Sequence, residues 1–316
     1  MTAKGVCWSL APNPTISDNR TTSGNGEGSF TSTLIHLAGG TTYYVRAYAT
    51  NSVGTAYGAQ VSFTTPSPAT NLDITVNGYT FRMKFVAGGT FNMGAQSTNP
   101  SGANYDADAY NDENPVHSVA LSGFYIGETE VTQGLWDAVM GSSSSSHDEW
   151  SATYGLGANY PAYNISYYDM QTFITQLNAL TGRNFRMPTE AEWEYAARGG
   201  NQSQGYKYSG SNTVGDVAWI SSNSNGKTHP VKEKSPNELG IYDMSGNVWE
   251  FCRDWKGWYS SDFQVNPTGL DSGSNRVRRG GAWNSSNVNE NRVSRRDGVV
   301  PYFRGNYIGA RLVLTE

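Results

Sequence analysis

Cysteine is nearly absent from this sequence, because the 316 residues contain only Cys7 and Cys252, in different predicted domains. Two such cysteines exclude the disulfide framework that holds many small secreted domains together. Long apolar stretches are missing too: no run of about 18 apolar residues is present, so we expect no membrane insertion. Residues 1–5 lead straight into a strand-like pattern without the apolar core of a signal peptide. We therefore expect the native targeting signal to lie outside this sequence.

Charged residues are scarce at 16%, and the two signs are unevenly distributed. The net charge of −5 argues against a general nucleic-acid binder, and no lysine follows Lys256. Residues 276–316 contain eight arginines and three acidic residues, a net charge of about +5 against about −10 elsewhere. Two interpretations stay open: these arginines are ion-pair partners inside the fold, or their planar guanidinium groups form a surface for anionic or polar ligands.

What is present indicates a folded, turn-rich chain, with 36 glycines and 13% aromatic residues, long enough for two domains. Residues 1–65 alternate side-chain types in the period-2 pattern of a β-sandwich. The stretches GVCWSLAPNPTISDNRT and LAGGTTYYVRAYATNSVGTAYG resemble fibronectin type III-like modules of bacterial surface proteins. Such modules run to roughly 90–100 residues. The resemblance therefore implies a partial all-β sandwich module at residues 1–66 that lacks its opening strands.

A short linker, PSPAT at residues 66–70, precedes the second predicted domain. The domain opens with a hairpin that turns at Asn77-Gly78. Capping residues and apolar periodicity predict three helices: residues 132–140, residues 166–182 between Ser166 and Gly182, and residues 189–199 with a capping box of Thr189 and Glu192. The remaining chain after residue 200 reads as loops and short strands.

Five motifs follow in order after residue 72: VAGGTFNMGA, ENPVHSVALSGFYIGETEVTQGLW, FRMPTEAEWEYAARGG, KSPNELGIYDMSGNVWEFCRDW and RVRRGGAW. In this order they resemble the formylglycine-generating enzyme family, also called sulfatase-modifying factors. The resemblance spans about residues 72–315 and implies an α+β, C-type lectin-like domain at residues 71–316. Its core aromatics would be Trp193, Tyr195, Trp249 and Trp255. We expect the acidic side chains of the third helix to cap its start in contact with solvent: Glu190, Glu192 and Glu194.

The resemblance also carries a test for catalysis, because the enzymes of this family hold copper with two cysteines that follow the RGGS motif, and soft thiolates suit Cu(I). The matching positions here carry Ser285 and Glu290. A second enzymatic branch uses iron held by clustered histidines. The histidines here lie in separate segments without metal-ligand spacing: His36, His117, His147 and His229. The expectation is therefore a non-catalytic protein with no copper and no catalytic residues.

Members of this family often carry structural calcium, and one such site matches the motif IYDMSGNVWE. The resemblance implies a Ca²⁺ ion held by the carboxylates of Asp243 and Glu250 and by the carbonyl oxygens of Gly246 and Val248. Ca²⁺ takes six to eight such oxygen ligands in flexible geometry. The alternative is that Asp243 and Glu250 only hydrogen-bond the backbone of this loop.

The stretch from residue 280, GGAWNSSNVNENRVSRRDGVVPYFRGNYIGARLV, resembles the variable region of diversity-generating retroelement proteins, many of which share this fold. In such systems a reverse transcriptase copies a template with errors at adenines, so asparagine codons change most freely. Ala310 departs from the pattern, in which phenylalanine is usual. The fixed positions implied by the resemblance are Arg292, Val293, Ser294, Arg296, Pro301, Arg304, Gly309, Arg311, Leu312 and Val313.

A mutated asparagine codon cannot become Lys, Gln, Glu, Met or Trp, which together make up 44 of the 316 residues. Of these types only Glu290 occurs within residues 284–310, consistent with a variable region at about residues 282–310. Its Tyr, Arg, Asn and Ser side chains are the mix found at binding hot spots and in antibody loops. The alternative is that its aromatic residues are buried core. The predicted ligand-binding residues are Trp283, Asn284, Ser285, Ser286, Asn287, Asn289, Asn291, Arg295, Asp297, Val299, Val300, Tyr302, Phe303, Asn306 and Tyr307.

The sequence thus predicts a non-catalytic receptor or adhesin that binds a macromolecule, a protein or a surface glycan rather than nucleic acid. We expect it outside the cell, on a bacterial surface or a phage particle, with its oligomeric state open. Two rivals are a formylglycine-generating-type oxidase and a fixed adhesin without diversification.

Overall fold

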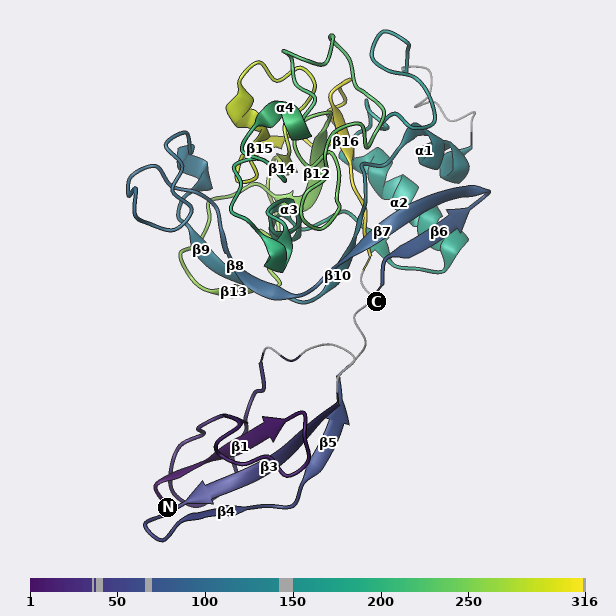
Figure 1. The fold of residues 1–316 in the computed structure, drawn as a ribbon. Helices are drawn as coiled ribbons and strands as arrows, with labels where there is room; N and C mark the ends of the chain where they lie inside the picture. Colours follow the sequence, from purple (N-terminus) through teal and green to yellow (C-terminus); the bar gives the residue numbers. More distant parts are fainter. Residues whose placement is uncertain (36, 38–41, 66–69, 142–149, 315–316) are drawn as a thin grey trace. The chain divides into compact units, whose positions relative to one another are not determined.

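The computed structural model describes residues 1–35, 37, 42–65, 70–141 and 150–314. The chain divides into two compact units, Met1–Thr70 and Asn71–Glu316, at the PSPAT segment (Figure 1). Residues 66–69 of that segment and the histidines at positions 36 and 147 lie outside the described residues. Within the described residues there is no helix with the length and apolarity that a membrane crossing requires.

In the described part of unit 1, the strands form one antiparallel sheet in the order β2-β1-β3-β4, and β5 also pairs with β3. The long strand β3 pairs with β1 along one edge, while β4 and β5 share the other. A turn at residues 51–54 joins β3 to β4, and in it Asn51 N–H donates to Gly54 O at 3.0 Å. The strands are β1 (Ala3–Ser9), β2 (Asn19–Arg20), β3 (Thr42–Thr50), β4 (Thr55–Tyr57) and β5 (Val61–Thr64).

The expected sandwich differs from what unit 1 shows. A sandwich packs two sheets face to face, whereas the described residues of unit 1 form a single sheet. Its apolar face buries Trp8, Tyr43 and Val45, and the side chains of Leu34 and Leu37 pack against them. A coil segment therefore covers the face on which a second sheet was expected.

Unit 2 is rich in short strands arranged in three sheets within its described residues (Figure 1). All neighbouring strands are antiparallel except the pairs β12–β16 and β13–β9. The first sheet has the order β11 (Phe185–Arg186), β17 (Val313–Leu314), β10 (Phe124–Gly127), β7 (Tyr79–Val86) and β6 (Leu72–Val76). The second is β15 (Arg296–Val299), β14 (Arg276–Arg279), β12 (Trp249–Trp255) and β16 (Ile308–Ala310), and the third is β13 (Gln264–Val265), β9 (His117–Leu121) and β8 (Gly89–Met93).

The hairpin predicted at the start of unit 2 is confirmed. Strands β6 and β7 pair through the two-residue turn Asn77-Gly78, whose φ angles are 46° and 83°. Positive φ at both central residues is the geometry that matches the right-handed twist of the flanking strands, and Asn-Gly adopts it at low cost.

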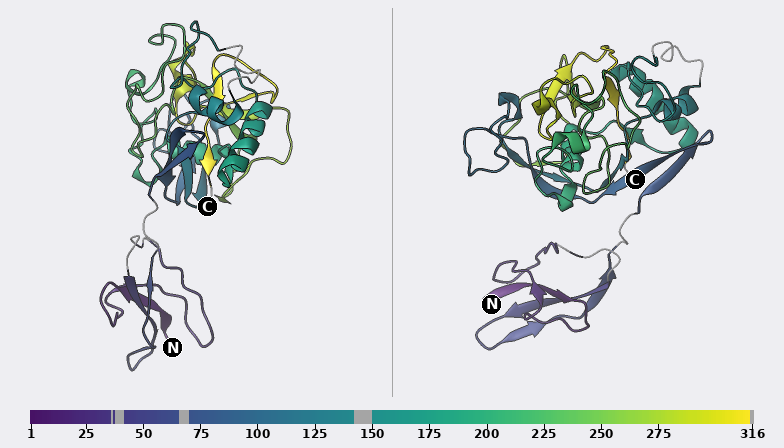
Figure 2. Two further views of the ribbon diagram at one scale, coloured as in Figure 1. Left: turned by 90° about the vertical axis from the view of Figure 1, so that its right-hand side faces the viewer. Right: turned by 45° about the horizontal axis from the view of Figure 1, so that its top comes forward.

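The three predicted helices are confirmed, and the described residues also contain one short helix and three 3₁₀ turns. Thr132, Ser166 and Thr189 are N-caps whose side chains accept a backbone N–H. Helices α1 and α2 lie beside the β6–β7 hairpin (Figure 2) and stack Trp136 on Phe173 at 4.8 Å. The elements are α1 (Gln133–Met140), α2 (Tyr167–Thr181), α3 (Glu190–Ala197), α4 (Val214–Val217), η1 (Asn111–Glu113), η3 (Gly200–Gln202) and η4 (Val288–Asn291).

Helix α3 runs through the core, and all eight of its residues are buried. Trp193 and Tyr195 join the main apolar cluster of unit 2, and Trp249 is buried as well, as predicted. Trp255 is only half-buried, with the guanidinium of Arg276 3.5 Å from its ring centroid.

The acidic residues of α3 correct the sequence prediction. Glu190, Glu192 and Glu194 were expected at a solvated helix start, yet all three are buried. A buried carboxylate requires a cation or several donors. Glu192 is paired with Arg186 at 2.6 Å, and the partners of the other two come from the C-terminal segment.

Candidate ligand-binding surface

Four arginines of the C-terminal segment are buried ion-pair partners, so the structural interpretation of these arginines is confirmed. Two charges held at such short range in the interior satisfy one another, whereas either one alone would be strongly unfavourable. The pairs are Arg279 with Glu194, Arg292 with Glu113 at 2.5 Å, Arg296 with Glu190 at 2.6 Å, and Arg311 with Glu250 at 2.7 Å.

The pair of Arg279 with Glu194 also affects the pKa of the carboxylate. Burial acts to raise the pKa of Glu194, but Arg198 and Arg279 outweigh it, so the pKa lies below its usual value. The carboxylate therefore stays ionised in the core, and these arginines tie η1, α3 and β12 to the C-terminal segment. They are unavailable to a ligand.

Two glycines turn the chain from β14 into the predicted binding segment. Gly280 and Gly281 have φ angles of 97° and 76°, where L side chains are strained. A Cβ at Gly281 would lie 2.1 Å from Oδ1 of Asn291 and 3.0 Å from the carbonyl oxygen of Glu290. The RGG part of the family motif is thus needed for the close approach of η4 to this turn.

The predicted binding residues lie mostly at the surface, at the end of unit 2 away from the C-terminus, where β15 and η4 lie (Figure 1). Tyr302 is exposed, with 71% of its surface accessible. The other exposed positions are Asn284, Ser286 and Asn287. The half-buried positions are Asn289, Arg295, Asp297, Val299, Val300, Phe303, Asn306 and Tyr307.

Ser285 and Asn291 are buried, which corrects their place among the predicted contact residues. The hydroxyl of Ser285 accepts the backbone N–H of Ala282 at 3.1 Å. The amide of Asn291 donates to the carbonyl of Val288 at 3.2 Å. Both side chains hold the backbone of this segment and face no solvent.

The stretch from Val299 to Phe303 is part strand and part turn. Val299 ends strand β15 and pairs with Arg276 of β14. The next residues form a turn in which Phe303 N–H donates to Val300 O at 3.0 Å. Both valines are half-buried, while Tyr302 is exposed to solvent.

One group of predicted residues gathers around Trp283, which is itself largely buried. Its indole Nε1 donates to the carbonyl of Asn306 at 2.9 Å, so two distant parts of the segment meet there. Tyr307 follows directly, with the ring of Phe303 6.0 Å away. The ring of Tyr154 lies 6.0 Å from that of Trp283 on the other side. We call these five residues the Trp283 cluster.

Arg278 of β14 joins the Trp283 cluster to Asp297. Its guanidinium lies 5.9 Å from the ring centroid of Tyr307 and 4.7 Å from that of Trp249. It also pairs with Asp297 at 2.6 Å. Burial acts to raise the pKa of Asp297, but Arg278 outweighs it and lowers the pKa below the usual value. The pair is therefore charged across the neutral pH range.

A second group of predicted residues meets at Tyr110, just before η1. The side-chain amide of Asn287 donates to the Tyr110 hydroxyl at 3.1 Å. The guanidinium of Arg295 lies 4.4 Å from the centroid of the same ring. Tyr110 is exposed and so adds an aromatic side chain from outside the variable region to the surface.

Tyr110, Tyr154 and Arg278 were missed by sequence reasoning. The two tyrosines lie more than 100 residues before the segment they contact, and nothing local to them indicates a binding role. Arg278 was counted among the basic residues, but its position beside Tyr307 follows from the pairing of β12 with both β14 and β16. Only tertiary contacts identify these three.

The residues predicted to hold calcium do not fit that ion. Glu250 accepts hydrogen bonds from Arg311 at 2.7 Å and from Trp193 Nε1 at 2.8 Å, so a guanidinium already neutralises it. One oxygen of Asp243 accepts the backbone N–H of Lys232 at 2.9 Å. No group of three or more Asp, Glu, His or Cys side chains in the described residues is placed to hold a metal.

Backbone N–H groups of the loop around these carboxylates are hydrogen-bonded within the fold. Gly246 N–H donates to Gly280 O at 2.8 Å, and Val248 N–H donates to Glu130 at 3.1 Å. Burial and the nearby charge of Asp243 raise the pKa of Glu130 well above its usual value. For Asp243 itself, burial raises the pKa to about 6.

The positions that match the family's copper ligands carry no thiol. Ser285 is buried against Ala282, and Glu290 is half-buried in η4. Cys252 lies in the apolar core, where burial raises the pKa of its thiol well above the usual value, and Cys7 belongs to unit 1. Thiolate binding of Cu(I) at this surface therefore has no donor in this chain.

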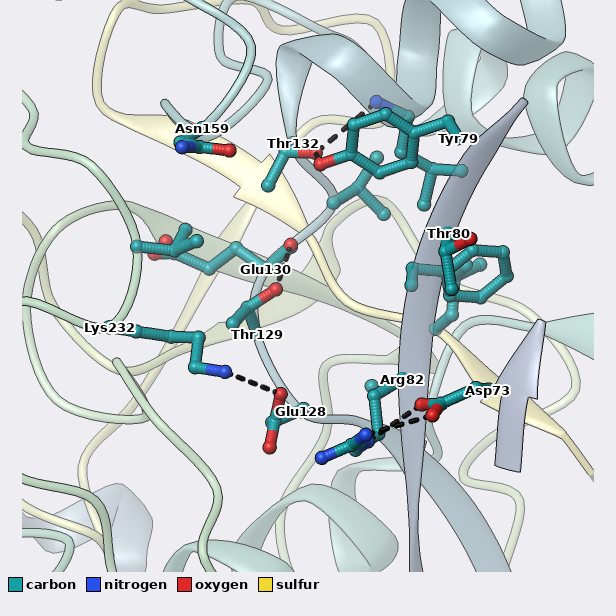
Figure 3. Close-up of a pocket in the computed structure, with 16 residues that line it drawn as sticks. Asp73, Tyr79, Thr80, Arg82, Glu128, Thr129, Glu130, Thr132, Asn159 and Lys232 are labelled. Atoms are coloured by element: carbon teal, nitrogen blue, oxygen red, sulfur yellow. Dashed lines mark hydrogen bonds and ion pairs between the residues drawn. The ribbon is translucent and has the colours of Figure 1, made fainter. Parts of the chain in front are cut away.

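A polar hollow of about 320 Å³ lies between β7, the segment after β10 and Lys232 (Figure 3). None of the predicted ligand-binding or calcium-binding residues lines it. Its polar side chains are paired with one another: Arg82 with Asp73 at 2.7 Å, Lys232 with Glu128 at 2.8 Å, and Tyr79 with Thr132 at 2.7 Å. We place no ligand there.

Comparison with known proteins identifies the family of unit 2. The sulfatase-modifying factor enzyme 1-like domain matches residues 75–316. The chain belongs to this family. A formylglycine-generating enzyme of Streptomyces coelicolor is 30% identical over 284 residues, which cover 71% of this chain and 86% of that enzyme. The family membership predicted from the five motifs is thereby confirmed.

Solved structures of the family extend the comparison. Treponema denticola variable protein 1 has a TM-score of 0.67 and 32% identity, and the match covers 79% of this chain and all of that one. PvdO from Pseudomonas aeruginosa has a TM-score of 0.62 and 25% identity, over 75% of this chain and 95% of that one. This sulfatase-modifying factor family member is therefore similar both to named enzymes and to a variable protein.

Proposed function

We propose that this protein is a non-catalytic ligand-binding protein of C-type lectin-like fold whose binding surface is diversified by a retroelement. One observation carries the proposal. Of the fixed positions implied by the variable-region pattern, all are buried except Arg304, which pairs with Asp169 at 2.7 Å. Of the 15 predicted ligand-binding residues, only Trp283, Ser285 and Asn291 are buried, and a tryptophan cannot arise from a mutated asparagine codon. A surface can change freely only where the fold does not depend on the side chain.

The chemistry of the surface supports recognition of a macromolecule, a protein or a surface glycan. Tyr302, Phe303 and Tyr307 offer large contact area at low entropic cost, and the asparagines and serines offer adaptable hydrogen bonds. The net charge of −5 disfavours nucleic acid. We place the protein outside the cell, on a bacterial surface or a phage particle, with unit 1 as a fibronectin-like stalk.

The gene and its neighbourhood test the diversification. We expect an adjacent reverse transcriptase gene and a near-copy of the final ~100 nucleotides with asparagine codons at the varied positions. Sibling isolates should differ at positions such as Asn287, Tyr302 and Tyr307 and agree at Arg292, Arg296 and Arg311. Identical sequences throughout would instead favour a fixed adhesin.

The rival function is that of a formylglycine-generating-type oxidase, which the similarity to the Streptomyces coelicolor enzyme favours. It is tested by adding copper, oxygen and a cysteine-containing sulfatase peptide to the full chain. We expect no conversion of the cysteine to formylglycine, because Ser285 and Glu290 offer no thiolate for Cu(I). Turnover would overturn the proposal of a non-catalytic protein.

A further inference from the structure

A cavity of about 460 Å³ in unit 2 is lined by none of the predicted binding residues. Its inner wall is formed by the start of α3 and the end of β12, and its outer wall by the loop of residues 257–270. The loop folds back on itself, because Leu270 forms a β-bridge with Trp255. Strand β13 within it pairs with β9, which fixes the loop to the third sheet.

Asp254 lies at the inner wall of this cavity as a buried carboxylate without a counter-ion. Only 5% of its surface is exposed, and one oxygen accepts the backbone N–H of Glu190 at 2.9 Å. Among the described side chains, no lysine, arginine or histidine pairs with it. Burial, with the nearby charge of Glu190, raises the pKa of Asp254 to about 7.

The only arginine that lines the cavity is already neutralised. Arg296 donates to both carboxylate oxygens of Glu190, at 2.7 and 2.6 Å, and to the carbonyl of Gly257 at 2.7 Å. Since Glu190 and Arg296 cancel, Asp254 leaves the cavity with one uncompensated negative charge. A buried charge of this kind is satisfied either by a proton or by a cation from outside.

The outer wall of the cavity is apolar and open to solvent. Trp258, Val265 and Leu270 line it with exposed fractions of 75%, 63% and 53%. Large apolar side chains that remain this exposed beside a cavity are typical of a ligand site. A tryptophan face also attracts organic cations.

We propose that this cavity binds an alkylammonium group, whose charge lies at Asp254 and whose alkyl stem lies against Trp258 and Leu270. The site goes beyond the proposed function, because it uses none of the positions predicted to vary. Its ligand would then be the same for every variant of the ligand-binding surface. Both a free amine and the lysine side chain of a partner protein carry this chemistry.

The test uses the full chain and n-butylammonium chloride, with n-butanol as the uncharged control, measured by saturation-transfer NMR and calorimetry. We expect n-butylammonium to bind and n-butanol not to bind. Asp254→Asn should weaken binding by roughly tenfold, the effect of one charge-assisted hydrogen bond. Equal binding of the alcohol, or unchanged affinity of Asp254→Asn, would overturn the proposal.

Two further variants keep the test decisive. Trp258→Ala removes a side chain that is mostly in solvent, so it leaves the fold intact and should weaken binding several-fold. Asp262→Asn, an exposed carboxylate of the same loop, should leave the affinity unchanged, and so should Tyr302→Ser on the ligand-binding surface. If Trp258→Ala binds as tightly as wild type, the cavity is not the site. Comparing n-butylammonium with N-acetyl-lysine amide distinguishes a free amine from a lysine side chain.

Discussion

The buried arginines of the C-terminal segment and its exposed side chains alternate along one short stretch of chain, and they have opposite roles. Arg292, Arg296 and Arg311 reach into unit 2 and hold acidic residues of distant elements. Tyr302, Asn284 and Ser286, a few positions away, contribute little to the interior. The comparison teaches that residue type does not separate scaffold from surface here, because an arginine can belong to either.

The division has a physical cause. A buried ion pair is costly to break, since removing one partner leaves an unpaired charge in the interior. An exposed tyrosine or asparagine can be replaced at little cost to folding. A chain that alternates the two can change its surface while its core stays constant.

The largest effect should come from breaking a buried pair. Arg311→Ala leaves Glu250 without its guanidinium in an interior that also holds Glu130 and Asp243, so unfolding free energy should fall by roughly 3–5 kcal/mol. Urea unfolding followed by tryptophan fluorescence reports unit 2, because eight of the nine tryptophans lie there.

The matched control for that variant is Arg304→Ala. Arg304 also pairs with a carboxylate, that of Asp169, but its side chain is 54% exposed. The decrease in unfolding free energy should stay below about 1 kcal/mol, because solvent screens exposed ion pairs. An equal decrease of the unfolding free energy in the two variants would show that burial does not decide how much an arginine contributes to stability.

A second prediction concerns the pH dependence of stability at Asp254. Its folded-state pKa of about 7 lies above the ordinary value of 3.8, so the folded protein binds this proton more tightly than the unfolded chain. Stability from this group is present below about pH 4 and is lost as the pH rises to 7. The unfolding free energy of Asp254→Asn, relative to that of wild type, should therefore rise by up to about 1.4 kcal/mol per pH unit across that range.

Unfolding at pH 5 and pH 8 measures this difference, and the exposed Asp262→Asn serves as the control. Relative to wild type, the unfolding free energy of Asp254→Asn should be higher at pH 8 than at pH 5 by on the order of 2 kcal/mol. The same gain at both pH values would mean that Asp254 does not titrate in this window.

A third prediction compares neighbouring serines within the segment. Ser285→Ala leaves the backbone N–H of Ala282 without its acceptor in the interior, which should cost about 1 kcal/mol. Ser286→Ala, at an exposed position, should change the unfolding free energy by less than about 0.5 kcal/mol. If the two variants unfold at the same urea concentration, position 285 belongs to the surface after all.

The smallest effect on stability is expected at Tyr302, the most exposed aromatic residue of the predicted binding segment. Tyr302→Ser should leave the unfolding free energy within about 0.5 kcal/mol of wild type. It should nevertheless reduce binding to a protein ligand selected against the wild-type surface, because aromatic side chains dominate such contacts. A large loss of stability would place Tyr302 in the scaffold.

Local chemistry made much of the fold predictable. The capping residues Thr132, Ser166 and Thr189 and the turn at Asn77-Gly78 act within a few residues, so the sequence was sufficient to place three helices and a hairpin. Glu190 and Glu194 of α3 were misjudged, because the C-terminal arginines that pair with them lie 106 and 85 residues further along the chain. No pattern in the neighbouring sequence indicates an ion-pair partner so far along the chain.

The binding segment itself was predictable because its order of fixed and changeable residues is a property of the chain. Which members face solvent was decided by packing: Ser285 and Asn291 turn inward to support the Gly280-Gly281 turn. Tyr110, Tyr154 and Arg278 reach the surface only because η1, the segment before α2 and β14 are brought against the segment from elsewhere. The sequence alone determined the family, the local elements and the segment that carries the binding residues. The tertiary structure decided which charges are buried and which side chains share a surface, since burial and proximity arise from contacts between residues far apart in the chain.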